Sequence, residues 1–334
     1  MEAVILIKKI ILLFTVSAFF IAALLISNNP WQQEKNAVSI AISKTPLSTP
    51  FYIAKHINAF KGTCVSVEFV EVLGGQAAFS KVMNREVDFG TSSDSVIAFQ
   101  SLNTKEFVTH ASFVQSDNDV KLITLLKDKI NTVFDLKGKK IGVTKGTASE
   151  YFLSTLLALE GLTIENVILV DYKPEKLISA LVNKEVVAIV PWEPYAFQSQ
   201  LQLKNKIKIH DTKSINTLSF NLISQKADDP LVQKAKCIIQ GLTLAIDYIA
   251  AHPTQSKEIV KNELNLSSDF IEWVWDDYIF KLSLNQSLIQ SIKSQHIWAV
   301  EHQNVSRKAL PNFNSFVDER ALLLVDPQAV NIQR

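Results

Sequence analysis

The sequence predicts an α/β protein of two units followed by a helical segment, and three observations support this fold class. From Ala37 onward, short apolar runs alternate with amphipathic stretches, which is typical of βαβ units around a mostly parallel sheet. The same alternation recurs between residues 139 and 192, and after about Leu222 the chain becomes mostly helical. With 334 residues, the chain has room for about two domains.

The elements follow in order from hydrophobic spacing and from the residues that start and stop helices. In the first unit we expect strands at 38–43, 65–72 and 87–93 and helices at 50–60 and 77–86. In the second unit we expect strands at 139–143, 166–172 and 186–192 and helices at 148–161 and 174–185. Helices at 231–252, 254–264, 268–282 and 287–300 complete the chain.

Two segments flank the second unit, 111–119 and 215–224, and both are predicted to be extended crossovers. Two lobes joined by two crossings form a cleft, and hinge closure on a ligand follows from that arrangement. We therefore expect lobe 1 to contain residues 37–113 and 222–330, and lobe 2 to contain residues 114–221.

The N-terminus has the layout of a membrane-targeting segment. Lys8 and Lys9 precede an unbroken apolar run at 10–26, and a polar stretch follows it. Residues 1–30 are thus either a cleaved signal peptide or an uncleaved anchor in the inner membrane; a buried core helix is a weaker alternative. Both membrane interpretations place Trp31 onward outside the cytoplasm, in the periplasm or an equivalent extracytoplasmic space.

Composition excludes several function classes. A formal net charge of +1 gives no basic face for nucleic acid. Cys64 and Cys237 are too few for a cysteine-rich metal site, and we expect two buried free thiols, with one disulfide as the alternative. The sequence holds no glycine-rich nucleotide loop and no catalytic serine elbow, so we expect no enzyme activity, no cofactor and no metal.

Polar segments that follow the strands are the candidates for ligand contact, because ligands of open α/β sheets bind beyond the carboxyl ends of strands. These segments are 43–50, 74–76, 91–95 and 144–149. In the last of them, Gly146 lets the backbone approach a ligand, Thr147 and Ser149 offer hydroxyls, and Lys145 could add charge. A polar loop that only caps a helix is the alternative for each segment.

Two acids and one aromatic residue extend this candidate site. Trp192 follows a strand of the second unit and could form a wall of the cleft, or it could seal the end of the sheet. Asp94 and Glu193 would suit a ligand that carries an amine, although Asp94 could also serve only as a helix cap.

Taken together, the stretches 43–62, 74–95, 135–162 and 166–195 resemble the nitrate/sulfonate/taurine-type substrate-binding proteins of ABC importers. The resemblance covers about residues 37–330. It implies a two-lobed type II periplasmic-binding-protein fold with a ligand cleft between the lobes and a helical C-terminal tail. It also implies ligand contacts from Ser43, Thr45, Ser48, Gln76, Ser92, Ser93, Asp94, Lys145, Gly146, Thr147, Ser149, Trp192 and Glu193.

The expected function is therefore capture of a small organic solute, anionic or zwitterionic, for an ABC permease in the membrane. We expect a monomer that also meets the membrane through its N-terminal segment and binds no nucleic acid. A membrane-anchored sensor that uses the same cleft is the main alternative, and an enzyme on this fold is the third. The related thiamine-pyrimidine synthases carry a cysteine cluster that this chain lacks, which argues against that enzymatic branch.

Overall fold

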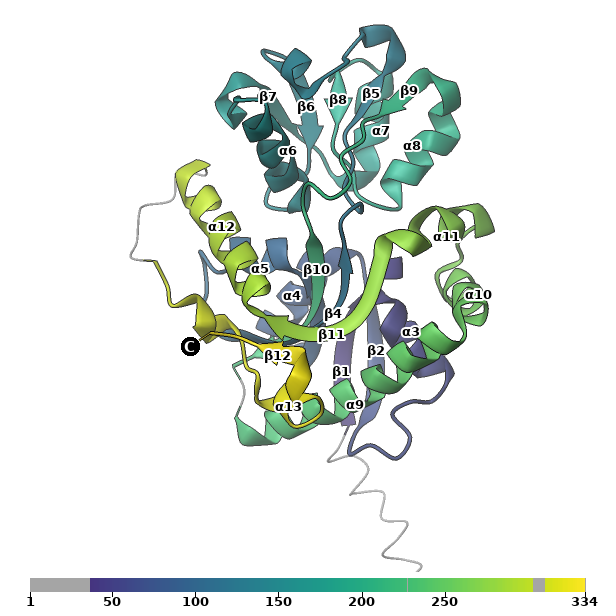
Figure 1. Ribbon diagram of the computed structural model, residues 1–334, viewed down its shortest axis with the longest axis vertical. Helices are drawn as coiled ribbons and strands as arrows, with labels where there is room; N and C mark the ends of the chain where they lie inside the picture. The colour runs from purple at the N-terminus through teal and green to yellow at the C-terminus, as the bar shows by residue number, and fades with distance from the viewer. Residues whose placement is uncertain (1–36, 227, 303–309, 334) are drawn as a thin grey trace, which may run out of the picture.

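The computed structural model describes residues 37–226, 228–302 and 310–333, which form two lobes, each built on its own β-sheet (Figure 1). The sheet of lobe 1 runs in the order β12 (Val330–Asn331), β11 (Tyr278–Asn285), β4 (Phe107–Ser116), β10 (Leu218–Gln225), β3 (Phe89–Ser93), β1 (Ala37–Ser43) and β2 (Ser66–Val72). The sheet of lobe 2 runs in the order β7 (Ile168–Asp171), β6 (Lys140–Val143), β8 (Ala188–Ile189), β5 (Ile123–Leu125) and β9 (Ile207–Ile209).

Helices cover both sheets, and most of them belong to lobe 1. These are α3 (Thr49–His56), α4 (Gly74–Met83), α5 (Asp94–Gln100), α9 (Asp229–Ala251), α10 (Pro253–Leu264), α11 (Ser268–Val274), α12 (Gln286–His302) and α13 (Arg320–Leu323). Lobe 2 has α6 (Ala148–Leu159), α7 (Leu177–Val182) and α8 (Tyr195–Leu203). Short 3-10 turns lie at Pro46–Ser48, Leu126–Asp128, Val133–Leu136, Ile164–Asn166, Pro174–Lys176, Lys204–Lys206, Trp275–Asp277, Phe313–Phe316 and Pro327–Ala329.

The predicted membrane-targeting segment at 1–30, with its apolar run at 10–26, lies outside the described residues. Within the ranges that the structure describes, no helix is long and apolar enough to cross a membrane.

Both sheets are mixed, so the prediction of a mostly parallel sheet was wrong. In lobe 1, β1 is parallel to β2 and β3, whereas β10 is antiparallel to both β3 and β4. The reason is that β4 carries the chain out of lobe 1 and β10 brings it back. Two neighbouring strands that cross the same boundary in opposite directions must pair antiparallel.

The predicted helix at 268–282 is also wrong beyond Val274, because the chain turns there into strand β11. From Tyr278 on, burial alternates: Tyr278, Leu282 and Leu284 are buried, while Ile279 is exposed. This period of two fits a strand, and β11 pairs with the outer edge of β4.

The core of lobe 1 lies between its sheet and the helices that cover it. Phe51 on α3 meets Phe113 on β4 edge-on at 5.0 Å, and Phe79 on α4 meets Phe107 in the same way at 5.0 Å. All four side chains are buried. Such aromatic pairs fix how each helix sits on its face of the sheet.

One disulfide bond links two segments of lobe 1. Cys64 and Cys237 are bonded, with their Cα atoms 5.7 Å apart, so the expectation of two free thiols was wrong. The bond joins the segment before β2 to α9, across 173 residues of sequence. That separation is why spacing along the chain gave no sign of the pairing.

Candidate functional site

In lobe 1, the carboxyl ends of β1 and β3 place several predicted residues side by side. The backbone N–H of Ser43 donates to the Thr91 hydroxyl at 2.9 Å, which ties the end of β1 to β3. The Thr45 hydroxyl accepts from the N–H of Leu47 at 3.3 Å and so starts the turn before α3. The hydroxyls of Ser43 and Ser48 are buried and have no hydrogen-bond partner among the described residues.

The loop from β3 into α5 adds a third hydroxyl of this kind. Ser92 donates to the carbonyl of Gly75 at 3.3 Å, and Ser93 caps α5 by accepting from the N–H of Val96 at 3.2 Å. These two predicted residues therefore hold the loop. The hydroxyl of Ser95, the last residue of the predicted segment 91–95, is buried and has no partner in the described part of the chain.

Gly75 explains why this loop can lie so close to α4. A Cβ atom on Gly75 would stand 3.1 Å from both the Cα of Ser92 and the N of Ser93. The neighbouring Gln76 is exposed, and its Oε1 accepts from Gln100 at 3.2 Å. The glycine thus shapes the site, while Gln76 stands at its rim.

Both carboxylate oxygens of Asp94 accept hydrogen bonds from other residues of the protein. One carboxylate oxygen accepts from the N–H of Ser219 at 3.3 Å, and the other accepts from Ser291 at 2.7 Å and Gln295 at 3.0 Å. Burial raises the pKa of Asp94, and these hydrogen bonds oppose that rise. The carboxylate therefore joins α5 to β10 and α12, and Ser93 rather than Asp94 caps the helix.

In lobe 2, the loop between β6 and α6 is also held from within. Gly146 has a positive φ of 69°, and its N–H donates to Glu150 at 2.9 Å. The hydroxyl of Thr147 donates to the carbonyl of Thr144 at 2.7 Å and accepts from the N–H of Ser149 at 3.2 Å. The Lys145 side chain is exposed.

Ser149 lies deeper than its loop neighbours. It is completely buried, and its hydroxyl donates to the carbonyl of Val190 at 2.6 Å. Ser149 therefore joins the start of α6 to the end of β8.

Glu193 lies in a buried polar cluster at the boundary between the lobes, and Trp192 precedes it in the chain. Trp192 is half-buried and meets the ring of Tyr195 at 6.1 Å. Oε1 of Glu193 accepts from the indole of Trp273 at 2.7 Å and lies 3.7 Å from Nζ of Lys121, while Oε2 accepts from the N–H of Phe197 at 3.0 Å. Burial raises the pKa of Glu193, and Lys121 opposes that rise.

The structure brings the two halves of the predicted site to opposite sides of one boundary. Helices α5 and α6, which follow the predicted loops of lobe 1 and lobe 2, contact each other. Tyr151 on α6 has its pKa raised by burial and also by the charge of Asp94.

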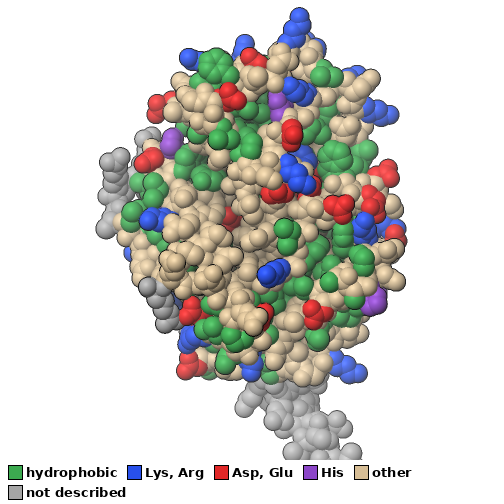
Figure 2. Space-filling view, viewed as in Figure 1, with side chains coloured by type: hydrophobic (Ala, Val, Ile, Leu, Met, Phe, Trp, Pro, Cys, Tyr) green, Lys and Arg blue, Asp and Glu red, His purple; other side chains and the backbone are tan. Residues whose placement is uncertain are grey.

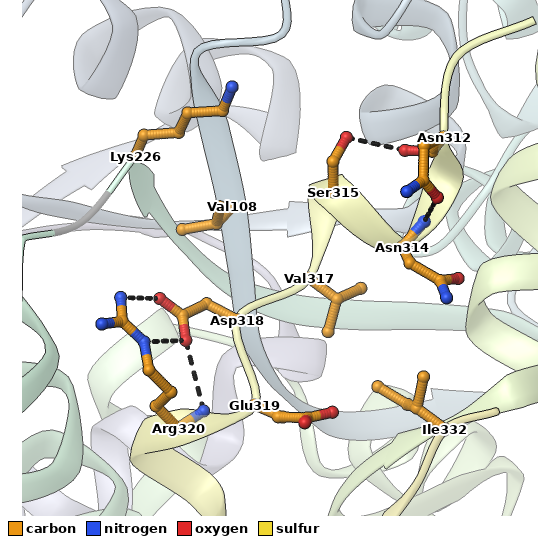
Figure 3. A pocket seen from close by; sticks show the side chains of 10 residues that line it. All are labelled: Val108, Lys226, Asn312, Asn314, Ser315, Val317, Asp318, Glu319, Arg320 and Ile332. Carbon is orange, nitrogen blue, oxygen red and sulfur yellow. Dashed lines mark hydrogen bonds and ion pairs between the residues drawn. The ribbon is translucent and has the colours of Figure 1, made fainter. Parts of the chain in front are cut away.

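A pocket of 620 Å³ lies elsewhere, on lobe 1 (Figure 3). It is lined by Val108, Lys226, Asn312, Asn314, Ser315, Val317, Asp318, Glu319, Arg320 and Ile332. None of the thirteen predicted contacts belongs to this lining. In Figure 3, the Arg320 guanidinium turns toward Asp318, to which it is bonded at 2.7 and 2.9 Å.

The visible surface carries no large patch of charges of one sign. Figure 2 shows basic and acidic side chains interspersed on the visible face, in agreement with a net charge of +1. Among residues 37–226, 228–302 and 310–333, no group of three or more His, Cys, Asp and Glu side chains could hold a metal ion.

Comparison with known proteins decides the family. The profile of the family described as "NMT1/THI5 like" matches residues 45–256, which is more than half of the chain. The chain belongs to this NMT1/THI5-like family. A candidate aliphatic sulfonates-binding protein of Bacillus subtilis (strain 168) is 25% identical over 287 residues, which cover 80% of this chain and 86% of that relative.

Solved structures support the NMT1/THI5-like assignment at the level of the fold. The periplasmic aliphatic sulphonate binding protein SsuA from Escherichia coli superposes with a TM-score of 0.69 at 19% identity, over 82% of this chain and 95% of SsuA. The alkanesulfonate-binding protein SsuA from Xanthomonas axonopodis pv. citri, bound to MOPS, gives 0.70 at 18% identity, over 85% and 98%.

These matches confirm the expected resemblance to SsuA/NMT1-like binding proteins and the two-lobed periplasmic-binding-protein fold. The relatives named here are binding proteins and not enzymes.

Proposed function

We propose that this NMT1/THI5-like protein is the extracytoplasmic solute-binding protein of an ABC importer, and that it binds a small sulfonate or a chemically similar anion between its lobes. Three buried serine hydroxyls carry the proposal. Ser43, Ser48 and Ser95 lie where β1 and β3 end, and none of their Oγ atoms has a partner among the described residues. Buried polar groups are nearly always hydrogen-bonded, so three such hydroxyls at one end of the lobe 1 sheet predict an acceptor from outside the chain.

The chemistry of these donors fits an oxyanion with several acceptor oxygens. A hydroxyl donates one hydrogen bond, and a bond to a charged acceptor is stronger than one to a neutral acceptor. The names of the sulfonate-binding relatives support this class of ligand. An amine on the ligand would have to compete for Asp94 and Glu193, whose oxygens already accept hydrogen bonds from the protein.

Binding calorimetry on the full chain tests the proposal with taurine, linear alkanesulfonates, nitrate, aromatic carboxylates and pyrimidines as probes. We expect saturable binding of at least one sulfonate. Binding of pyrimidines alone would contradict the ligand class, and no binding by well-folded protein to any probe would contradict the function.

A matched pair of variants then locates the site. Ser95→Ala removes a buried hydroxyl at the lobe boundary, whereas Ser256→Ala removes an equally buried and equally unpartnered hydroxyl on α10. Because a hydrogen bond to a charged group contributes about 1.5–3 kcal/mol, Ser95→Ala should weaken sulfonate binding roughly tenfold or more. Ser256→Ala should leave it unchanged. Equal effects of the two substitutions would place the ligand elsewhere.

A further inference from the structure

Two tryptophan contacts join the lobes, and one of them is made to Glu193 of the predicted site. On one flank, α11 of lobe 1 packs against α8 of lobe 2, and on the other flank α12 packs against α6 (Figure 1). Both α11 and α12 come from the helical C-terminal part of the chain. In each contact, the indole N–H of a lobe 1 tryptophan donates to an acceptor in lobe 2.

The contact between α12 and α6 is built around Trp298. Its indole N–H donates to the hydroxyl of Ser154 at 2.5 Å, and its ring meets the edge of Tyr151 at 5.8 Å and of Phe99 at 5.9 Å. Trp298, Phe99 and Ala299 form a buried cluster separate from the main core, with Tyr151 of lobe 2 packed against it. This flank therefore has a small apolar core to which both lobes contribute.

The contact between α11 and α8 is built around Trp273. Its indole N–H donates to Glu193 at 2.7 Å, and its ring lies 5.7 Å from that of Phe197. Phe197 also meets Phe270 of α11 at 5.1 Å. Glu193 and Phe197 belong to lobe 2, so separation of the lobes would break this hydrogen bond and expose the buried ring of Phe197.

Helix α12 is firmly attached to the predicted ligand site of lobe 1. Its Ser291 and Gln295 both donate to Asp94, the residue directly before Ser95. The next residue, His296, is hydrogen-bonded through Nδ1 to the hydroxyl of Ser101, the C-cap residue of α5, at 2.6 Å. These hydrogen bonds attach α12, which carries Trp298, to Asp94 and Ser101 of lobe 1. Breaking the Trp298 contact would therefore separate α6 from α12 and α5 together.

We propose that Trp273 and Trp298 act as two clasps that hold the lobes together before a ligand enters, so that access to the site waits until both contacts break. This inference deepens the proposed function and depends on it for the identity of the site. On this proposal the same contacts are made before and after binding, so they contribute little to the equilibrium affinity. They reduce the fraction of open molecules, and that fraction limits how often a ligand can enter.

The distance between two spin labels, one on each lobe, tests the clasps without any ligand. The chain has two cysteines, and both are in the disulfide, so an introduced pair supplies the only free thiols. Leu73→Cys and Leu159→Cys place the labels at positions that are 80% and 67% exposed, in lobe 1 and lobe 2. Pulsed electron spin resonance on the labelled full chain then reports the distribution of distances between the lobes.

The decisive variant is Trp273→Phe combined with Trp298→Phe, which removes both indole donors. Trp275→Phe is the matched control, because Trp275 meets Phe280 and Lys257 within lobe 1. We expect one short distance in the wild type and in the control, and a second, longer population in the double variant. A double variant with the same distribution as the control would overturn the proposal.

Ser154→Ala tests the Trp298 contact without changing the tryptophan itself, because it removes only the acceptor of the Trp298 hydrogen bond. Combined with Trp273→Phe, it should also produce the longer population, and an unchanged distribution here would equally count against the clasps. Since neither measurement uses a ligand, a failure of the clasps and a failure of the sulfonate assignment are distinguishable.

Discussion

Asp119 accepts a hydrogen bond from the hydroxyl of Tyr278 at 3.0 Å, and this bond joins the crossover after β4 to the first residue of β11. Asp119 is buried, and its surroundings hold further charged groups: Glu193 and Asp277 repel its negative charge, while Lys121 attracts it. Burial, followed by the charge of Glu193, raises the pKa of Asp119 to about 7.

We therefore predict that Asp119 makes the folded protein less stable as the pH rises from about 4 to about 7. In this window the unfolded chain has already released the proton, whereas the folded chain still binds it, so a rise in pH favours unfolding. Urea unfolding at a series of pH values measures the slope. Asp119→Asn should flatten it, and Asp211→Asn, at an exposed acid, should not. Identical slopes in wild type and Asp119→Asn would contradict the assignment.

Glu193 offers a second test, because its two oxygens serve different donors. Glu193→Gln retains an acceptor for either Trp273 or Phe197, whereas Glu193→Ala leaves both donors unpaired. Each unpaired buried donor costs about 1–3 kcal/mol, and both variants leave Lys121 without its carboxylate. We expect alanine to lower the free energy of unfolding by about 1–3 kcal/mol more than glutamine does. If the two variants unfold at the same urea concentration, these bonds contribute nothing net.

The disulfide should contribute strongly to stability, since it closes a long loop in the unfolded chain. A dithiol reductant, or replacement of Cys64 and Cys237 by serine, should lower the free energy of unfolding by about 2–5 kcal/mol. The serine variant is also the control, because the reductant should not change its stability. A reductant effect that persists in that variant would show that the loss has another cause.

Gly241 on α9 lies against the ring of Phe60. A Cβ atom at Gly241 would stand 2.4 Å from Cε1 of that ring, which is too close for any real contact. Gly241→Ala should therefore lower the thermal unfolding midpoint despite the better helix propensity of alanine, because overpacking costs about 1–3 kcal/mol. Adding Phe60→Leu should restore part of the loss. Without such recovery in the double variant, the clash with Phe60 would not be the cause.

Local sequence signals predicted those elements whose neighbours in space are also neighbours in sequence. The strand predicted at 38–43 and the helix predicted at 148–161, between Gly146 and Gly161, correspond to β1 and α6. Strand β11 was missed because the apolar residues of 268–282 also fit a helical period. Its partner β4 lies more than 150 residues earlier, and that pairing decides the outcome.

The sequence predicted where the candidate site lies better than it predicted which side chains are available to contact a ligand. Ser43 and Ser48 in segment 43–50, and Ser95 in segment 91–95, were expected because polar residues follow a strand there. The distinction between a hydroxyl that holds a loop, as in Ser93, and one without a partner depends on packing. For Asp94, the deciding partners Ser291 and Gln295 lie about 200 residues away in the sequence.

The two crossover strands run side by side, and β4 and β10 stay paired up to Ser116 and Leu218. A two-stranded ribbon flexes most easily out of its own plane and resists shear within it. We therefore expect the relative motion of the lobes to be mainly a rotation about one hinge axis. Distances measured between different pairs of points across the boundary should accordingly change in a correlated way, as functions of one angle.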